Sequence, residues 1–451
     1  MLERLGVLIV AENASVRQGG ESSLAMHWFL ELLKEGVEAH LLVHVRSKPE
    51  LDQLLSGFAS RIHYVPDVLL QKICWNLGKA LPAHVRSFTS EWLVHLITQF
   101  MQRRAARRLI EQHKFDIVHE PAPVTPRLPS MMYGLGVPVV IGPMNGNMTY
   151  PSGFRSRSLL ERAFVPVARS FADLGNYLVP GKREAEVLLV ANERTRVALP
   201  SGCTGKVRIL CENGVEPDVW RRPDDLPARP DDGLRLAFLG RLLAWKVDML
   251  IDVFVEVKKD APSAELWIIG DGPERPRLQR QAEALGVSGA VTFHGWAAPE
   301  ECPRLLSQCD VFLYPSVFDC GGAVVLEAMS LGLAVVALNW GGPGDYLASG
   351  AGVLVEPVDR RQSIAELAKA VRSLTPSKRR ELGAAAQREI ADHYTWPAKV
   401  RQMLRVFQSV CKCAGTASGA VSPVEEHVYF DCDQSRGLQS AVRVAMRSEP
   451  C

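Results

Sequence analysis

The sequence contains no apolar run long enough to cross a membrane and has almost no net charge. A membrane-spanning helix takes about 20 apolar residues. The N-terminal apolar run, residues 5–10, is too short even for the core of a signal peptide. The formal net charge of +2 gives no reason to expect a nucleic-acid partner. We therefore expect a protein that neither crosses a membrane nor binds nucleic acid.

Sequence patterns for metal, redox and dinucleotide chemistry are also missing. The ten cysteines form no C-x-x-C pair, and Cys411 and Cys413 have no second ligand pair with which to hold zinc. No G-x-G-x-x-G follows the first apolar run, which argues against a dinucleotide site. We expect no metal, no cofactor and a reducing, cytoplasmic location. Peripheral attachment to the cytoplasmic face of a membrane is the alternative location.

Short apolar runs alternate with helical stretches in both halves of the chain. The candidate strands are residues 5–10, 37–44, 116–120, 137–142, 176–180 and 207–211, then 234–240, 264–270, 290–295, 310–314, 334–339 and 352–356. Ser22 or Ser23 is placed to cap a helix that runs to about Glu35. Alternating strands and helices predict two doubly wound parallel sheets, with a ligand cleft between the two domains.

The Pro-rich segment 217–233 divides these two series and is predicted to be a linker. We therefore expect Rossmann-like domains over residues 1–216 and 234–390. Residues 391–413 are expected to form a terminal helix. Residues 414–451 are rich in Ser, Gly and Ala without sustained periodicity, which predicts a disordered tail, although the run HVYFDC could add a strand.

The most informative segment follows the apolar run at 310–314. Asp319 lies in a short loop, Gly321 and Gly322 open a helix, and Glu327 comes eight residues after Asp319. A glycine-opened helix start attracts an anion through its N–H groups and dipole. Glu327 lies roughly 8 Å along the helix, about the span of a diphosphate between two sugars. An ordinary turn followed by a solvated acid is equally compatible with this spacing.

Two cations follow the strand at 234–240. Arg241 ends this run and Lys246 lies five residues further on, so both fall at the carboxyl end of the sheet, where ligands bind in doubly wound folds. Two cations in a cleft can neutralise a diphosphate leaving group without a metal. The alternative is that both are solvated loop residues.

The first half offers weaker candidates. Gly20 precedes a helix and would let a phosphate approach the backbone, but a plain turn explains it as well. His119 ends a strand, where a structural hydrogen bond is the common role. The helix over 91–115 carries Arg103, Arg104, Arg107 and Arg108, so it either lies on an anionic membrane or is a surface helix.

The segment from Asp319 to Glu327 resembles the carboxylate-x7-carboxylate element of the retaining family 4 glycosyltransferases, which have the GT-B fold. The string GRLLAWK, residues 240–246, is similar to that family's diphosphate-binding element. The resemblance implies two Rossmann-like domains facing across a cleft. The first would be the acceptor-side domain and the second the nucleotide-sugar-binding domain, and the terminal helix would cross back to the first.

The same resemblance implies roles for the candidate residues. Asp319, where the family usually has Glu, would contact the sugar hydroxyls, and Glu327 would hold the ribose. Arg241 and Lys246 would grip the donor diphosphate. The remaining two candidates would also face the donor, with Gly20 at its phosphates and His119 at the transferred sugar.

The resulting prediction is a metal-independent, retaining hexosyltransferase. It would move a sugar from a nucleoside diphosphate to a hydroxyl of a glycan or lipid-linked saccharide. Two alternatives stay open: a non-catalytic sugar-nucleotide-binding protein, and a GT-B enzyme that epimerises or hydrolyses a nucleotide sugar.

Overall fold

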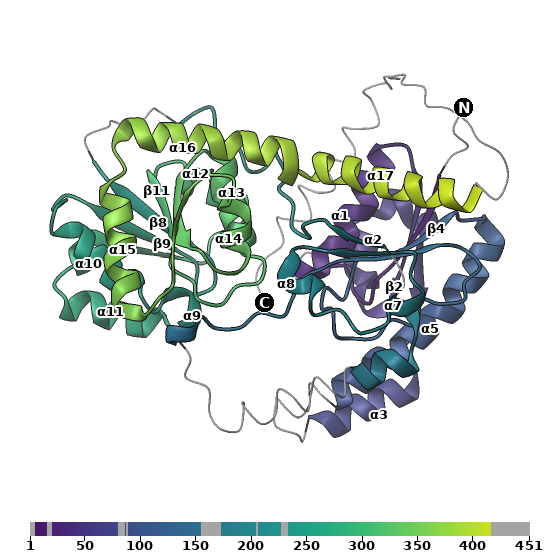
Figure 1. Ribbon diagram of the computed structural model, residues 1–451. Coiled ribbons are helices and arrows are strands. Elements are labelled where there is room, and N and C mark those ends of the chain that lie inside the picture. Colours follow the sequence, from purple (N-terminus) through teal and green to yellow (C-terminus); the bar gives the residue numbers. More distant parts are fainter. Residues whose placement is uncertain are drawn as a thin grey trace. The chain divides into compact units, whose positions relative to one another are not determined.

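The computed structural model describes residues 5–15, 20–79, 86, 89–154, 173–203, 206–226 and 233–415. It divides into two compact units (Figure 1). The first unit contains the described residues up to 147, those of 173–212, and those from Val400 onward. The second contains residues 148–154 and the described part of 213–399. The predicted tail lies outside the described residues from position 416, and so does linker segment 227–232.

The first unit is built on a seven-stranded parallel sheet with the order β3-β2-β1-β4-β5-β6-β7. Its strands are β1 (Gly6–Val10), β2 (Glu38–His44), β3 (Ile62–Val65), β4 (Ile117–Glu120), β5 (Val139–Met144), β6 (Val187–Val190) and β7 (Lys206–Ile209). The central strands β1, β4, β5 and β6 are buried along their whole length. In β1, for example, the four residues from Val7 to Val10 have no exposed surface.

The helices of this unit include one that follows the second unit in the sequence. They are α1 (Gly20–Lys34), α2 (Lys48–Leu54), α3 (Leu69–Gly78), α5 (Ser90–His113), α7 (Gly181–Glu184), α8 (Glu193–Arg196) and, from Val400, α17 (Trp396–Gly415). On α17, the yellow helix of Figure 1, Met403 and Phe407 are fully buried. Helix α17 therefore supplies part of the core of the first unit.

The second unit has a six-stranded parallel sheet with the order β10-β9-β8-β11-β12-β13. The strands are β8 (Arg235–Leu239), β9 (Glu265–Ile269), β10 (Val291–Gly295), β11 (Val311–Tyr314), β12 (Ala334–Leu338) and β13 (Val353–Val355). The helices are α9 (Ala244–Val247), α10 (Leu250–Lys258), α11 (Arg275–Ala284), α12 (Cys302–Leu306), α13 (Ala323–Ser330), α14 (Gly341–Leu347), α15 (Arg360–Arg372) and α16 (Pro376–Glu389). Part of the predicted linker packs on this unit, because Trp220 is buried and its carbonyl accepts a hydrogen bond from Ser330 Oγ (2.6 Å).

The predicted α/β class with two doubly wound parallel sheets is confirmed, with local errors in the first unit. Residues 173–178 are helical, so the strand expected at 176–180 is wrong. Strands β3 and β6 were not predicted. Helix α1 begins at Gly20, which places Ser22 and Ser23 inside the helix and not at its cap. Within the described residues, no helix combines the length and the apolar character that a bilayer span requires.

Candidate functional site

Both sheets have a point at which strand order reverses, and in the second unit the predicted donor residues gather there. Strands β8 and β11 are neighbours, and the chain winds outward from each in opposite directions. Doubly wound sheets bind ligands at the carboxyl ends of such a strand pair. Arg241 and Lys246 follow β8, whereas Asp319 follows β11. The sheet topology therefore brings the two predicted elements together.

Asp319 links the segment that follows β11 to the segment that follows β8. Its Oδ2 lies 2.7 Å from Lys246 Nζ and accepts a hydrogen bond from Tyr314 Oη (2.5 Å). Its Oδ1 accepts from the backbone N–H of Gly322 (3.0 Å). Asp319 thus holds the Lys246 ammonium in place and also fixes the start of α13. Sequence reasoning missed Tyr314, which ends an apolar strand and gives no polar signal there.

The glycines of this loop are required by its backbone geometry. Gly322 has φ +61°, a left-handed conformation that side chains rarely adopt. The loop also packs closely against the start of α14, where Gly342 N–H donates to the Asp319 carbonyl (3.1 Å). A Cβ added at Gly342 would lie 2.0 Å from the carbonyl oxygen of Gly321. The glycines therefore allow two loops to meet beside the Asp319–Lys246 pair.

Glu327 lies on the second turn of α13 and has part of its surface exposed. Burial raises the pKa of its carboxyl group to about 8. Among the described residues no hydrogen-bond or ion-pair partner faces this carboxyl. Burial raises the pKa of the Cys302 thiol, and the negative charge of Glu327 adds to this shift. A partly buried acid without a partner is suited to hydroxyl groups of a ligand.

Arg241 and Lys246 differ in their surroundings. Arg241 is exposed, and no partner for its guanidinium occurs in the described part of the chain. Lys246 is half-buried on α9 and is held by Asp319. One cation is thus fixed while the other keeps all its N–H donors available. Such a pair can bind an anion with several oxygens.

The first-unit candidates lie at the corresponding point of its sheet, between β1 and β4. Gly20 is the first residue of α1. His119 has no exposed surface, packs edge-on against Trp28 and Phe407, and its Nε2 lies 2.8 Å from the Gly142 carbonyl oxygen. Burial lowers the pKa of His119 to about 4. In this conformation the ring exposes no surface to a substrate, which favours the structural role.

The basic helix α5 uses two of its four arginines internally. Arg103 Nε donates to the Tyr133 carbonyl (2.9 Å), and its guanidinium stacks on the Tyr133 ring at 3.9 Å. Arg107 donates to the Gly134 carbonyl (2.8 Å). Arg104 and Arg108 are exposed. Half of the cluster therefore makes hydrogen bonds to a neighbouring loop, although Arg107 remains exposed.

Comparisons with known proteins agree with this geometry. Residues 225–389 match the family profile of glycosyl transferases group 1. The D-inositol 3-phosphate glycosyltransferase of Stackebrandtia nassauensis is 33% identical over 210 residues, 43% of this chain. The aligned part spans 47% of that relative, or about half its length. The alpha-D-kanosaminyltransferase of Streptomyces kanamyceticus is 26% identical over 61% of this chain and 72% of its own.

Solved structures have a similar fold over most of the chain. A glycosyltransferase from Rickettsia africae has a TM-score of 0.61 and 15% identity, covering 91% of this chain and 100% of its own. Anabaena HepE in complex with UDP has a TM-score of 0.60 and 15% identity, covering 90% and 100%. The comparisons therefore show the GT-B fold class, with its two Rossmann-like domains.

Proposed function

We propose that this protein is a retaining glycosyltransferase of family 4 that takes its sugar from a nucleoside diphosphate. One observation carries the proposal. The donor-site candidates lie on the elements that follow β8 and β11: the exposed Arg241, the Lys246–Asp319 pair, and Glu327, which has no partner within the described ranges. The match of residues 225–389 to glycosyl transferases group 1 supports this assignment.

The two cations would bind the donor diphosphate. Arg241 offers paired N–H donors that match phosphate oxygens, and Lys246 adds a fixed point charge. As the glycosidic bond breaks, negative charge builds on the leaving phosphate, so both cations stabilise the transition state more than the ground state. The first turn of α13 adds N–H groups and a positive dipole end. This set neutralises the leaving group without a metal ion.

The two acids would divide the sugars between them. Glu327 would accept hydrogen bonds from the ribose hydroxyls and thereby gain the partners that its carboxyl group lacks among the described residues. Asp319 would contact the transferred sugar with its remaining lone pairs while it holds Lys246. Asp319 is then a positioning residue as well as a sugar contact.

Retention of configuration rests on the family resemblance. In this part of the proposal the acceptor hydroxyl attacks from the face that the diphosphate leaves. A leaving phosphate oxygen takes the proton of that hydroxyl, so the enzyme supplies no covalent nucleophile. The residues of the second unit then act by binding and charge stabilisation alone.

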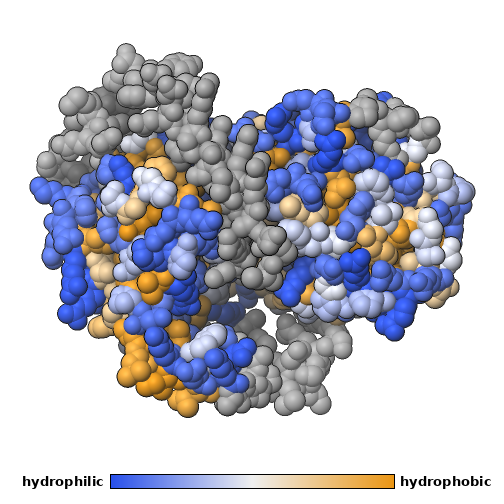
Figure 2. Space-filling view, turned by 180° about the vertical axis from the view of Figure 1, so that it is seen from behind, coloured by the Kyte–Doolittle hydropathy of each residue, from blue (hydrophilic) through white to orange (hydrophobic). Residues whose placement is uncertain are grey.

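A lipid-linked acceptor is favoured by an apolar surface on the first unit. Helix α3 has five side chains between 45% and 75% exposed, namely Leu69, Leu70, Ile73, Trp75 and Leu77. Leu93 and Phe100 of the adjoining α5 extend it, and Figure 2 shows the hydrophobic cluster as an orange region. Exposed lysines at 72 and 79 border these residues. Apolar side chains with basic neighbours suit an anionic bilayer surface.

Donor screening tests the enzymatic proposal. UDP- and GDP-sugars are compared for thermal stabilisation, and the best donor is then turned over with and without lipid-linked glycans. Transfer of the sugar with retained configuration supports the proposal. Donor consumption without an acceptor would indicate a hydrolase or epimerase, and stabilisation without turnover a binding protein. Activity that is strictly dependent on Mg²⁺ or Mn²⁺ would contradict the metal-free donor site.

Sedimentation with vesicles containing phosphatidylglycerol tests the membrane contact separately. Replacing Leu70 and Ile73 together by Glu should abolish sedimentation. Val358→Glu is the matched control, because Val358 is also exposed (49%) but lies on the second unit. Equal sedimentation of the two variants would remove α3 from the proposal and leave the donor site untouched.

A further inference from the structure

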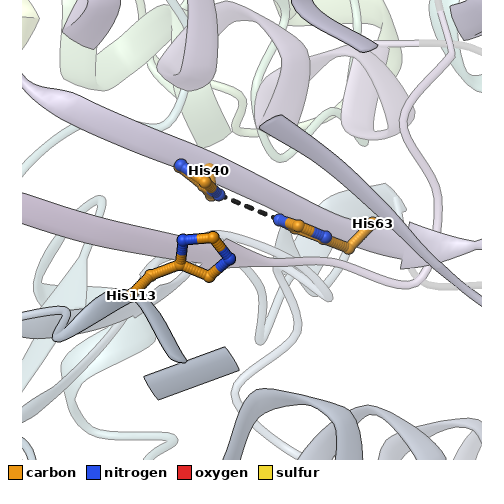
Figure 3. Close-up of side chains that lie close together, drawn as sticks. All are labelled: His40, His63 and His113. Carbon is orange, nitrogen blue, oxygen red and sulfur yellow. Dashed lines mark hydrogen bonds between the residues drawn. The ribbon is translucent and has the colours of Figure 1, made fainter. Parts of the chain in front are cut away.

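Three histidines meet on the first unit, on elements that the donor site does not use. His40 lies on β2, His63 on the edge strand β3, and His113 at the end of α5 (Figure 3). One ligand nitrogen from each lies within 4.8 Å of the others. His40 Nδ1 and His63 Nε2 are 2.9 Å apart, with their rings inclined by only 16°.

The sheet register explains why the first two rings meet. Leu42 of β2 is paired with His63 of β3, and His40 lies two residues before Leu42. Side chains alternate along a strand, so His40 and His63 point to the same face as diagonal neighbours. Helix α5 packs against these strands and ends at His113, where Lys114 adopts a left-handed conformation (φ 54°). The His113 ring centroid lies 4.7 Å from that of His40.

The chemistry of the cluster suits a late first-row divalent cation. Imidazole nitrogen is a preferred ligand of zinc, and two ligands of a tetrahedral zinc lie about 3.3 Å apart, given Zn–N bonds of about 2.0–2.1 Å. The 2.9 Å separation of the first two nitrogens needs only a small adjustment. His113 is exposed, so rotation of its side chain can bring the third nitrogen closer.

The surroundings favour a bound cation in two further ways. Glu38 Oε1 lies 3.4 Å from His40 Nε2, so the carboxylate can hold the proton on Nε2 and leave Nδ1 bare for a metal. Arg61 bridges to the same carboxylate at 3.0 Å and fixes its position. The C-terminal end of the long helix α5 also presents the negative end of its dipole at His113.

We propose that His40, His63 and His113 bind one Zn²⁺ ion, with water at the fourth position. The ion would tie the edge strand β3 to β2 and to the end of α5. Because it binds the folded protein through three elements distant in sequence, its effect is to stabilise the first unit. The proposal does not depend on the donor site and assigns the ion no part in sugar transfer.

The test uses full-length protein without a polyhistidine tag. Calorimetric titration should give one Zn²⁺ per chain, and Zn²⁺ should raise the Tm. Co²⁺ should give the intense visible absorption bands of a tetrahedral site. His63→Ala should abolish stoichiometric binding, and Glu38→Gln should weaken it about tenfold, the lower part of the range for loss of a group that orients a metal ligand.

Two more variants keep the test decisive. His113→Ala alters an exposed position at a helix end, so the fold should persist while Zn²⁺ binding is lost. His393→Ala, at an exposed histidine of the second unit, is the matched control and should bind Zn²⁺ normally. Zinc binding unchanged in both His63→Ala and His113→Ala, or no stoichiometric binding by the wild type, would overturn the proposal.

Discussion

Each sheet has one pair of neighbouring strands at which the strand order reverses, called here its junction. The two junctions carry side chains of different exposure. At the β8–β11 junction the side chains that follow the strands include an exposed cation and an acid that has no partner in the described part of the chain. At the β1–β4 junction, His119 and Glu120 are 0% and 2% exposed. Topology provides a place where a ligand can bind, but burial decides whether the residues found there face a ligand or the core.

The two ionisable residues Glu120 and Lys182 of the first junction are hydrogen-bonded within the protein, whereas Nδ1 of the buried His119 has no partner among the described residues. Glu120 accepts hydrogen bonds from Gln99 Nε2 (2.6 Å) and Ser130 Oγ (2.5 Å). The buried Lys182 donates to the Thr125 carbonyl (3.0 Å), and burial lowers its pKa to about 7. Such a network specifies the local structure. The second junction instead keeps groups available for a ligand.

The largest difference between the junctions should appear on removal of Arg241. Arg241→Ala should lower kcat by about 10²–10³, the range for loss of a key electrostatic donor, and leave the Tm unchanged because the side chain is exposed. Lys246→Ala should have a similar kinetic effect. Arg361→Ala, another exposed arginine of the second unit, is the matched control for steady-state kinetics. Near-normal kcat in both site variants would remove the donor assignment.

For His119 we expect a loss of stability with little loss of kcat. His119→Ala removes a buried ring and the hydrogen bond to Gly142, so it should destabilise the protein by about 3 kcal/mol, while kcat per folded molecule is kept. The folded-state pKa of His119 is about 4, below its ordinary value. Only the unfolded state gains its proton between about pH 6.5 and 4, so wild-type stability falls as the pH drops through this window.

The free energy of unfolding, measured with denaturant, should therefore differ less between wild type and His119→Ala at pH 5 than at pH 7. A loss of kcat at unchanged stability would instead place His119 at the transferred sugar. Residues at both junctions would then contact the donor.

Asp319→Glu restores the residue usual in the resembling family and sharpens the comparison within the second junction. The longer side chain must still reach Lys246 Nζ and the Gly322 N–H, in a loop that packs tightly against α14. We expect kcat to fall about tenfold, or the preferred donor sugar to change. Tyr314→Phe removes one hydrogen bond to the same oxygen and should have a smaller effect. Kinetics with several donor sugars distinguish these outcomes.

Glu327→Gln should give the smallest kinetic effect, a rise in donor KM of about tenfold with little change in kcat, because ribose contacts exist in ground and transition states alike. The same substitution should weaken donor binding but stabilise the folded protein at neutral and higher pH. The folded-state pKa of Glu327 is about 8, so wild-type stability falls as the pH rises from about 4.5 to 8. The variant should gain Tm relative to wild type between pH 5 and pH 8. A constant Tm difference would contradict this environment for the carboxyl group.

Apolar runs made most of the fold predictable. All six strands predicted in the second half lie within a residue or two of β8–β13, since buried parallel strands are continuous apolar segments. The errors fall where that signal weakens. Strand β3, with the sequence IHYV, carries a histidine and lies at a sheet edge. Residues 176–180 are apolar enough for a strand, yet 173–178 form a helix with Tyr177 and Leu178 exposed.

The site was predictable where chemistry lies in short, local patterns. The two glycines and two acids between 319 and 327 are close in sequence, and the strand order brings Arg241 and Lys246 to them. Tyr314 and the zinc-binding histidines could not be found in this way. In the sequence, Tyr314 is indistinguishable from the other apolar residues of its strand. His40, His63 and His113 come from three separate elements, and only the β2–β3 register and the end of α5 unite them.

The first unit is completed by the last described helix of the chain. Its β1 to β7 are made early in synthesis, but Met403 and Phe407 fill its core from α17. The second unit, encoded between them, therefore has all its strands and helices before the first unit can close. At about 5–20 residues per second, a ribosome needs on the order of ten seconds or more to add the residues after β7. During that time the core of the first unit lacks the side chains of Met403 and Phe407, so this unit stays incomplete until α17 has been made.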